Sequence, residues 1–242
     1  MKTAIIYTGQ ARTFEQVIAN QYWHVLRKFP DPQFFVSIEN DDQAGDMEKL
    51  YGYFPAERVH IQYVSQPQIP EPRLDPQWLA MYPPSSPPQA ILRQLWALRE
   101  GWRLAYSLTQ RWDDTIVVRL RPDLAFYRFD PPQFESVKAN DCLTPWWARW
   151  GGVNDRFAIM GFKAAWHYFN TFEKLTQLGA ENCPLHPETL VAASLEFGGV
   201  NSLPTLGTEF ATIRLDGSVV APSITVIDEV EYARSTTHRP TA

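Results

Sequence analysis

The sequence predicts an α/β fold in which helices flank a mostly parallel β-sheet. Short apolar runs rich in β-branched residues, which are typical of buried strands, recur at residues 3–7, 34–38, 59–64 and 115–120. Between these runs, apolar residues at helical spacing predict helices at residues 14–28 and 89–112. Strands that alternate with helices are typical of parallel, doubly wound sheets, so we expect one here.

The first strand leads into a loop with the features of an anion site. Thr8, Gly9 and Gln10 follow the strand, and Arg12 lies just before the helix at 14–28. Such a loop presents backbone N–H groups, and the helix adds the positive end of its dipole. Gly9 alone matches neither a dinucleotide-binding glycine motif nor a Walker loop, so the loop by itself does not identify a ligand.

A proline-rich segment interrupts the alternation after the third strand. We expect a short helix at residues 46–54, then the strand at 59–64. Residues 65–88 contain eight prolines, which exclude a regular helix or a central strand. The segment is either a linker between domains or a long binding loop inside one domain. Because the alternation resumes afterwards, the loop is favoured.

The helix at 89–112 leads into the most informative strand, at residues 115–120. Side chains alternate along a strand, so Arg119 and Arg121 point to the same face, and Asp123 follows at the same period. Pro122 cannot donate a ladder hydrogen bond, so pairing should stop near it. Ligands bind at this end of strands in open α/β sheets. The alternative is a surface ion pair between Arg121 and Asp123 that only closes the strand.

The second half of the chain continues with shorter elements. We expect irregular structure at 126–129, strands at 141–145, 157–160 and 224–227, and helices at 163–178 and 187–197. Asp216-Gly217 is a type I′ turn signal, which predicts a C-terminal β-hairpin of residues 211–215 and 218–221. A single domain should cover residues 1–232, with a flexible tail at 233–242.

Composition argues against several classes of protein. The net charge is −5 without a long basic run, whereas nucleic-acid-binding proteins are more often basic. Cys142 and Cys183 form neither a disulfide framework nor a zinc spacing, which fits a reducing, cytoplasmic setting. No run is long enough for a signal peptide or a transmembrane segment, and peripheral contact with a membrane stays open. Nine Trp suit an aromatic core or stacking on sugar rings.

Three segments, taken in order, resemble a known family. They are residues 8–14 after the first strand, residues 119–124 at the end of the middle strand, and residues 152–159 around Asn154-Asp155-Arg156. They resemble the predicted glycosyltransferases of bacterial polysaccharide gene clusters, which are similar to GT-A nucleotide-sugar transferases. The resemblance implies a GT-A-like (Rossmann-like) fold. It also implies transfer of a sugar from a nucleoside-diphosphate donor to a glycan, surface-polysaccharide or lipid-linked acceptor.

The resemblance also implies roles for individual residues. The donor nucleotide and its diphosphate would contact Thr8, Gly9, Gln10, Arg12, Arg119 and Arg121. Asp123 would hold a divalent metal, Mn²⁺ or Mg²⁺. Asn154 and Arg156 would lie near the transferred sugar or the acceptor, and the catalytic carboxylate would be Asp155 or, as second choice, Glu188. Independently of the resemblance, Trp147 and Trp150 are candidates for stacking on the acceptor, because aromatic faces suit the apolar side of a sugar.

Arg121 departs from the family pattern. It stands where the Asp-x-Asp motif of GT-A enzymes has its first Asp, so the motif offers one carboxylate, whereas a hard divalent cation wants several oxygen ligands. Either Asp123 binds the metal with water and phosphate completing the shell, or Arg119 and Arg121 neutralise the diphosphate themselves.

Each of these assignments has a structural alternative. Asp155 is also a typical turn residue, and Glu188 is also a favourable charge at a helix N-terminus. A function from another class is open as well: a non-catalytic nucleotide- or glycan-binding module that has kept the fold. Arg121 in place of an acidic residue is the feature that keeps that alternative open.

Overall fold

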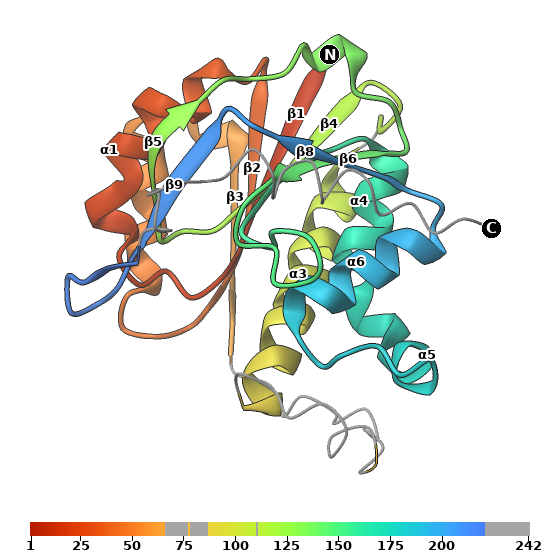
Figure 1. The fold of residues 1–242 in the computed structure, drawn as a ribbon. Helices are drawn as coiled ribbons and strands as arrows, with labels where there is room; N and C mark the ends of the chain where they lie inside the picture. Colours follow the sequence, from red (N-terminus) through yellow and green to blue (C-terminus); the bar gives the residue numbers. More distant parts are fainter. Residues whose placement is uncertain (66–76, 78–86, 110, 221–242) are drawn as a thin grey trace.

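A computed structural model describes residues 1–65, 77, 87–109 and 111–220 (Figure 1). Seven strands form one sheet in the order β3-β2-β1-β4-β7-β6-β8. They are β1 (Lys2–Gly9), β2 (Pro32–Glu39), β3 (Val59–Val64), β4 (Thr115–Leu120), β6 (Asp141–Pro145), β7 (Phe157–Met160) and β8 (Asn201–Thr205). Of these, β7 is antiparallel to its neighbours β4 and β6, and the other neighbours pair in parallel. The predicted mostly parallel α/β sheet is confirmed.

A second, antiparallel sheet contains three strands, β5 (Leu124–Phe129), β9 (Thr208–Ile213) and β10 (Val219–Val220). The expected C-terminal hairpin is β9–β10, but its turn has a positive φ at Gly217 and not at Asp216, so it is not type I′. The prediction of irregular structure at 126–129 is wrong. A β-bulge between Phe126 and Arg128 breaks the two-residue alternation by which β5 would have been recognised.

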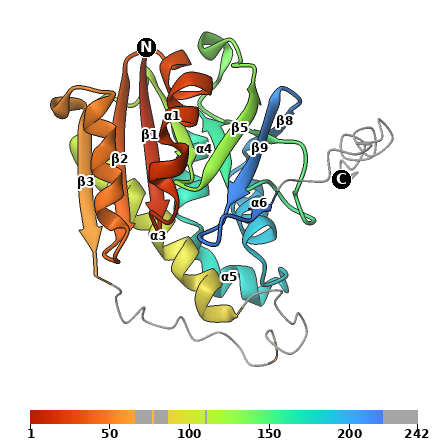
Figure 2. The same ribbon diagram turned by 90° about the vertical axis from the view of Figure 1, so that its left-hand side faces the viewer.

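Helices cover both faces of the main sheet. They are α1 (Phe14–His24), α3 (Pro88–Leu108), α4 (Phe162–Phe169), α5 (Leu175–Ala180) and α6 (Pro187–Phe197), with 3₁₀ turns η1 (Leu26–Lys28), η2 (Ala44–Gly52), η3 (Ala56–Arg58), η4 (Phe134–Ser136) and η5 (Thr171–Lys174). Helices α3, α4 and α6 lie on one side, and α1 lies on the other with the small sheet (Figures 1 and 2). None of the helices in the described ranges has the length and hydropathy that a membrane span requires.

Some predicted boundaries are corrected. The helix expected at 89–112 ends at Leu108, because Thr109 is already extended. The helix expected at 163–178 is three pieces, and the break comes at Asn170, whose side chain donates to the carbonyl of Trp166 at 2.8 Å. The helix expected at 46–54 is the 3₁₀ segment η2. The strand expected at 224–227 and the tail at 233–242 lie outside the described residues. Of the proline-rich segment 65–88, only residues 65, 77, 87 and 88 are described.

Strand β1 divides the core between the two faces of the sheet. Ala4 and Ile6 pack under α3 and α4, whereas Ile5 and Tyr7 pack with α1 and the small sheet. All four side chains are at most 2% exposed. Burial on both faces explains why this strand reads as a continuous apolar run, as is typical of central parallel strands.

Gly101 lets α3 approach β1 more closely than another residue would. A Cβ atom added at Gly101 would lie 2.2 Å from Cγ2 of Thr8 and 2.9 Å from Cγ2 of Ile6. Both distances are far inside van der Waals contact. The glycine therefore sets the spacing between the helix and the end of β1.

We expect Gly101→Ala to destabilise the protein by about 1–3 kcal/mol, because overpacking outweighs the gain of about 1 kcal/mol in helix propensity. Urea unfolding measures the change. Gly45→Ala is the matched control, because no atom lies within 4 Å of its added Cβ. A Gly101→Ala variant as stable as the wild type would show that α3 can move away from β1 without cost.

Candidate functional site

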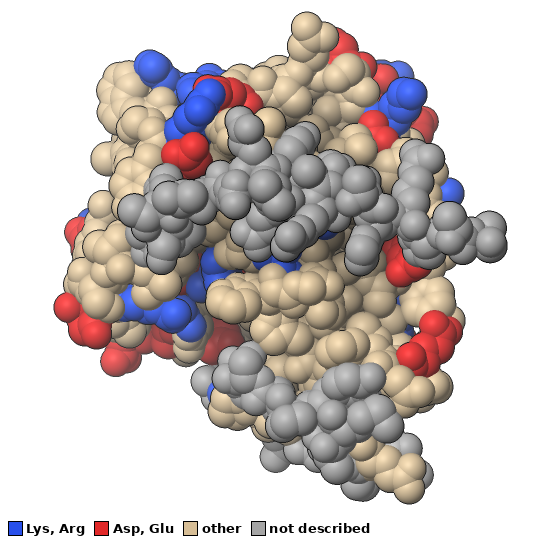
Figure 3. Space-filling model, viewed as in Figure 1, with Lys and Arg blue, Asp and Glu red and all other residues tan. Residues whose placement is uncertain are grey.

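A pocket of about 370 Å³ lies at the carboxyl ends of β1 and β4, between the start of α3 and the end of β9. Its lining includes two carboxylates, Glu39 and Asp123, and six arginines: Arg12, Arg93, Arg119, Arg121, Arg156 and Arg214. Lys and Arg atoms gather around a depression near the centre of this face (Figure 3). A chain with a net charge of −5 thus concentrates positive charge at one place.

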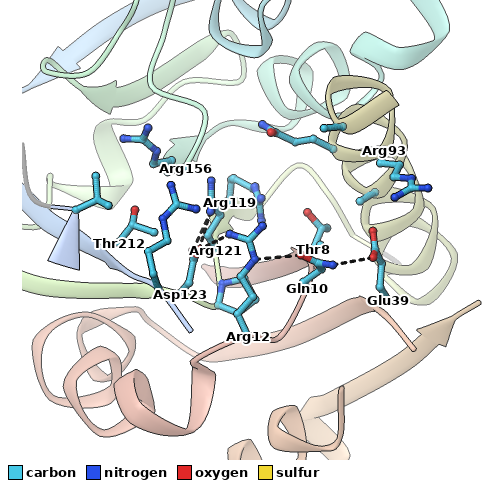
Figure 4. A pocket seen from close by; sticks show the side chains of 17 residues that line it. Thr8, Gln10, Arg12, Glu39, Arg93, Arg119, Arg121, Asp123, Arg156 and Thr212 are labelled. Carbon is cyan, nitrogen blue, oxygen red and sulfur yellow. Dashed lines mark hydrogen bonds and ion pairs between the residues drawn. The ribbon is translucent and has the colours of Figure 1, made fainter. Parts of the chain in front are cut away.

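The structure brings most of the predicted donor-site residues together here. The pocket is lined by Thr8, Gly9, Gln10, Arg12, Arg119, Arg121, Asp123 and Arg156, all of which the sequence singled out. In the close-up, Arg12, Arg119 and Arg121 converge with Asp123 near the centre (Figure 4). Glu39 and Arg93 lie toward one end and Arg156 toward the other.

The loop after β1 is held by its own side chains. Gln10 donates from Nε2 to Oε2 of Glu39 at 3.2 Å and accepts at Oε1 from Nε of Arg12 at 3.1 Å. Gly9 has a φ of +105° and Arg12 a φ of +47°. For Arg12 that left-handed conformation costs energy and is kept only where surrounding contacts hold it. The loop is therefore shaped to aim Arg12 at Asp123.

Asp123 is the anchor of the arginines. Arg121 donates to it through two hydrogen bonds, Nε to Oδ1 at 2.9 Å and Nη2 to Oδ2 at 2.6 Å, and Arg12 Nη1 lies 3.3 Å from Oδ2. Asp123 is 1% exposed. Burial alone would raise its pKa, but the charges of Arg121 and Arg12 outweigh burial and lower the pKa below its usual value. The carboxylate stays ionised and fixes both guanidinium groups.

Gln21 positions the turn that carries this ion pair. It lies on α1, is fully buried, and its Nε2 donates to the carbonyls of Arg121, Pro122 and Leu124 at 2.9–3.3 Å. Its Oε1 accepts from the hydroxyl of Tyr7 at 2.6 Å. Because Pro122 stops strand pairing, these carbonyls need another donor, and Gln21 supplies it. This role could not be predicted from the sequence, because Gln21 looks like any polar residue of an amphipathic helix.

Two buried polar atoms in the pocket lack partners among the described residues. Arg119 is 2% exposed; its Nη1 donates to the carbonyl of Leu120 at 2.9 Å, whereas its Nε has no partner. Oγ1 of Thr8, which is 2% exposed, also has none. Burial lowers the pKa of Arg119 to about 10, so it is still charged at neutral pH. Unpaired buried groups cost free energy, and a ligand rich in acceptor oxygens would satisfy both.

The residues at the predicted metal position do not fit a divalent cation. Both oxygens of Asp123 are engaged by arginines. Within the described ranges, no group of three or more His, Cys, Asp or Glu side chains is arranged to hold a metal. Mg²⁺ and Mn²⁺ need several oxygen ligands, and adjacent guanidinium groups repel them.

The two candidate catalytic carboxylates lie beside the pocket and not on its surface. Asp155, 3% exposed, accepts a hydrogen bond at Oδ2 from the amide of Gln94, which does line the pocket. Glu188 is 5% exposed, and its carbonyl accepts from the N–H of Val153 at 3.2 Å. A Cβ atom at Gly152 would lie 2.0 Å from that carbonyl, so the glycine allows the loop to dock on the start of α6. This docking brings Asp155 near Glu188.

Burial, and next the charge of Asp155, raise the pKa of Glu188 to about 8. Glu188 is therefore mostly protonated at neutral pH. Nδ1 of His186 lies 2.8 Å from Oε2 of Glu188 but without hydrogen-bond geometry. Burial also lowers the pKa of His186, so this contact joins two mostly neutral groups and is not a strong ion pair.

Of the four predicted acceptor residues, only Arg156 lines the pocket. Trp147 is 7% exposed, donates to the carbonyl of Thr208 at 2.8 Å and packs against Phe210. Asn154 is fully buried and donates to the carbonyl of Trp147 at 3.1 Å. Trp150 is 67% exposed and does not line the pocket. In this structure Trp147 and Asn154 shape the loop, and an acceptor role for them stays a prediction.

Among the pocket residues that were not anticipated from the sequence, four have charged or amide side chains: Glu39, Arg93, Gln94 and Arg214. Glu39 ends β2, so its place at the carboxyl edge beside β1 could have been read from the strand order. Arg93 and Gln94 lie in the first turns of α3, and Arg214 lies after β9. Only the packing of these elements on the sheet brings them to the pocket.

Comparisons with known proteins find no family and only distant structural similarity. No protein-family model matches the chain, and no match was found among curated proteins. The galactosyltransferase LgtC, solved with donor and acceptor sugar analogues, aligns with a TM-score of 0.44 and 11% identity over 84% of this chain and 73% of that chain. Mouse xyloside xylosyltransferase 1 in its apo form aligns with a TM-score of 0.41 and 6% identity over 84% of each chain. Because these scores and identities are low, we base no functional conclusion on them.

The raised pKa of Glu188 predicts a pH dependence of stability. Between its ordinary pKa of 4.5 and the folded value of about 8, the folded chain keeps a proton that the unfolded chain has lost. The free energy of unfolding should therefore fall as pH rises through this window. Glu188→Gln should flatten the dependence and raise stability near pH 8 by on the order of 2–4 kcal/mol.

Urea unfolding between about pH 5 and pH 8 measures this difference. Glu196→Gln, an exposed position on the same helix, is the control and should leave the pH dependence unchanged. Parallel pH profiles for the wild type and Glu188→Gln would mean that Glu188 ionises normally in the folded chain.

Arg119→Met should leave stability unchanged or raise it by about 1–3 kcal/mol, because Met removes a buried charge whose Nε is unpaired. Arg103→Met, at an exposed position on α3, should change stability by less than about 0.5 kcal/mol. Thermal or urea unfolding measures both variants. A loss of more than about 2 kcal/mol in Arg119→Met would show that the fold itself needs this arginine.

Proposed function

We propose that this protein transfers a sugar from a nucleoside-diphosphate donor to a glycan acceptor. One observation carries the proposal: Arg119, whose buried Nε has no partner among the described residues, lies with Arg12 and Arg121 around a pocket at the carboxyl edge of a mostly parallel sheet. Guanidinium groups suit the oxygens of a diphosphate in charge and in geometry. The resemblance of the loop and strand-end segments to nucleotide-sugar transferases supports the same ligand.

In this proposal the arginines stabilise the leaving group. As the bond from the sugar to the diphosphate breaks, negative charge builds up on the phosphate oxygens, and Arg12, Arg119 and Arg121 are already held in place to receive it. Asp123 keeps Arg12 and Arg121 in position without contacting the phosphate. No step requires a metal at Asp123.

The acceptor hydroxyl needs a base, and Asp155 and Glu188 remain the candidates. Gln94 contacts both the pocket and Asp155, so it connects the carboxylate with the place where a sugar would lie. Glu188, with a pKa of about 8, suits proton transfer near neutral pH. For an acceptor hydroxyl in the pocket to reach Asp155, the side chain of Gln94 has to move aside.

A non-catalytic binding module is the second candidate function. The observation that favours it is the burial of both candidate bases behind the pocket lining. Such a module would bind the nucleotide through the same arginines but would not turn over the sugar.

Calorimetric titration with nucleoside diphosphates and sugar nucleotides tests the proposal. We expect one nucleoside diphosphate to bind, with an affinity that EDTA or added Mn²⁺ changes by less than about threefold, and to bind at least about tenfold more weakly to Arg119→Met. Arg103→Met is the control and should bind as the wild type does. Binding that requires Mn²⁺ would contradict the arginine-based site.

Turnover separates the two candidate functions. Slow hydrolysis of the bound sugar nucleotide, measured by release of the nucleoside diphosphate, would support the transferase. Binding without any release, with or without glycan acceptors, would favour the binding module. No binding of any nucleotide would contradict the transferase and a nucleotide-binding module, and would leave a glycan-binding module.

A further inference from the structure

The pocket holds more positive charge than one sugar diphosphate neutralises. It contains six arginines and two carboxylates. One carboxylate, Asp123, is paired with Arg12 and Arg121, and the other, Glu39, accepts from the neutral amide of Gln10. The diphosphate of a sugar nucleotide carries one negative charge on each phosphate. Positive charge therefore remains after such a donor has bound.

The remaining charge lies largely beside the central arginines. Within the described ranges, neither Arg156 nor Arg214 forms an ion pair with a carboxylate. Arg156 precedes Phe157, the strand partner of Leu120, so it stands next to Arg121 at the end of the β4–β7 pairing. Arg214 follows β9, and its charge is one of those that lower the pKa of Arg12, after burial and Arg121. Like charges this close repel one another unless an anion lies between them.

The carboxyl group next to Arg156 does not relieve this repulsion. Glu188 is close enough for Arg156 to influence its titration, but burial keeps it mostly protonated at neutral pH. The charge of Asp155 acts on Arg119 and Arg121, so it offsets part of the central positive charge, but six arginines still outnumber Asp123, Glu39, Asp155 and the two charges of a diphosphate. Arg93 and Glu39 lie toward the other end of the pocket, away from Arg156 (Figure 4). The uncompensated charge is thus local to the side where the loop before β7 meets the end of β9.

We propose that the substrates bring a second anionic group, a carboxylate or a phosphate, which Arg156 and Arg214 bind beside the diphosphate. This inference rests on the proposed function and specifies its substrate class. The anion belongs either to the transferred sugar, as in a uronic acid, or to the acceptor, as in a phosphorylated or acidic glycan. A neutral sugar on a neutral acceptor would leave Arg156 and Arg214 without a partner.

Two binding arms test the proposal on the full-length chain. In the first, calorimetry compares a hexuronate and a hexose conjugate of the same nucleoside diphosphate. In the second, with the nucleoside diphosphate saturating, glycans with and without a phosphate or carboxylate are compared. We expect about tenfold tighter binding of the anionic compound in one arm, the value of a charge-assisted hydrogen bond. The arm that shows it identifies which substrate carries the anion.

Substitutions then assign the preference to these arginines. In Arg156→Gln and Arg214→Gln the preference should shrink to less than about threefold, while the nucleoside diphosphate itself still binds. Arg103→Gln, outside the pocket, should keep the full preference, and unfolding curves check that all variants fold. Equal binding of anionic and neutral compounds in both arms, or a preference that survives both substitutions, would overturn this proposal and leave the transferase intact. A wild type that binds no nucleotide would overturn the proposed function and this inference together.

Discussion

The site depends on one buried carboxylate. Asp123 joins Arg121, at the end of β4, to Arg12 in the loop after β1, which lies 111 positions before Asp123 in the sequence. Without a buried negative charge at this point, the two guanidinium groups would repel each other and turn toward solvent. Their attraction to Asp123 outweighs the cost of burial, which is why the pKa of that carboxyl lies below its usual value although it is 1% exposed. The arginines are therefore oriented before any ligand arrives.

The fold supplies the rest of the support from a distance. Gln21 on α1 satisfies the carbonyls that Pro122 leaves without a strand partner, and Tyr7 on β1 holds Gln21 in turn. On the opposite face, Gly101 lets α3 approach β1 at Thr8. Because each support comes from a different element, the position of the arginines depends on the packing of the whole first half of the sheet. A small shift of α1 or α3 would change the geometry of the pocket.

Local pattern was enough to predict the central strands but not the path of the chain around them. The strands at 115–120 and 157–160, which are buried along their whole length, were predicted with the bounds that the structure has, because buried β-branched and apolar runs have few alternatives. The bounds of the strands at 59–64 and 141–145 were also correct. Strand β5 was missed because a bulge disrupts its alternation. Arg119, Arg121 and Asp123 could be placed at a strand end from sequence alone, whereas Arg214 and Gln94 reach the pocket only through long-range packing. The bidentate pairing of Arg121 with Asp123, and with it the poor fit to a metal, follows from a turn geometry that no local pattern specifies.

The pocket also shows a conflict between stability and binding. A chain selected for stability alone would not bury Arg119 with an unpaired Nε, leave Thr8 Oγ1 without a partner and place Arg214 near Arg12. Each of these features lowers the free energy of unfolding, and under the proposed function each would be relieved by a ligand with several negatively charged oxygens. Supporting residues such as Gln21 and Asp123, by contrast, have their hydrogen-bonding groups satisfied. Other buried atoms, such as Oγ of Ser37 and Nε1 of Trp102, also lack a partner among the described residues, but Nε of Arg119 and Oγ1 of Thr8 belong to residues that line the pocket, where arginines outnumber carboxylates. This distribution is expected of a preformed anion site and not of a surface that is merely basic.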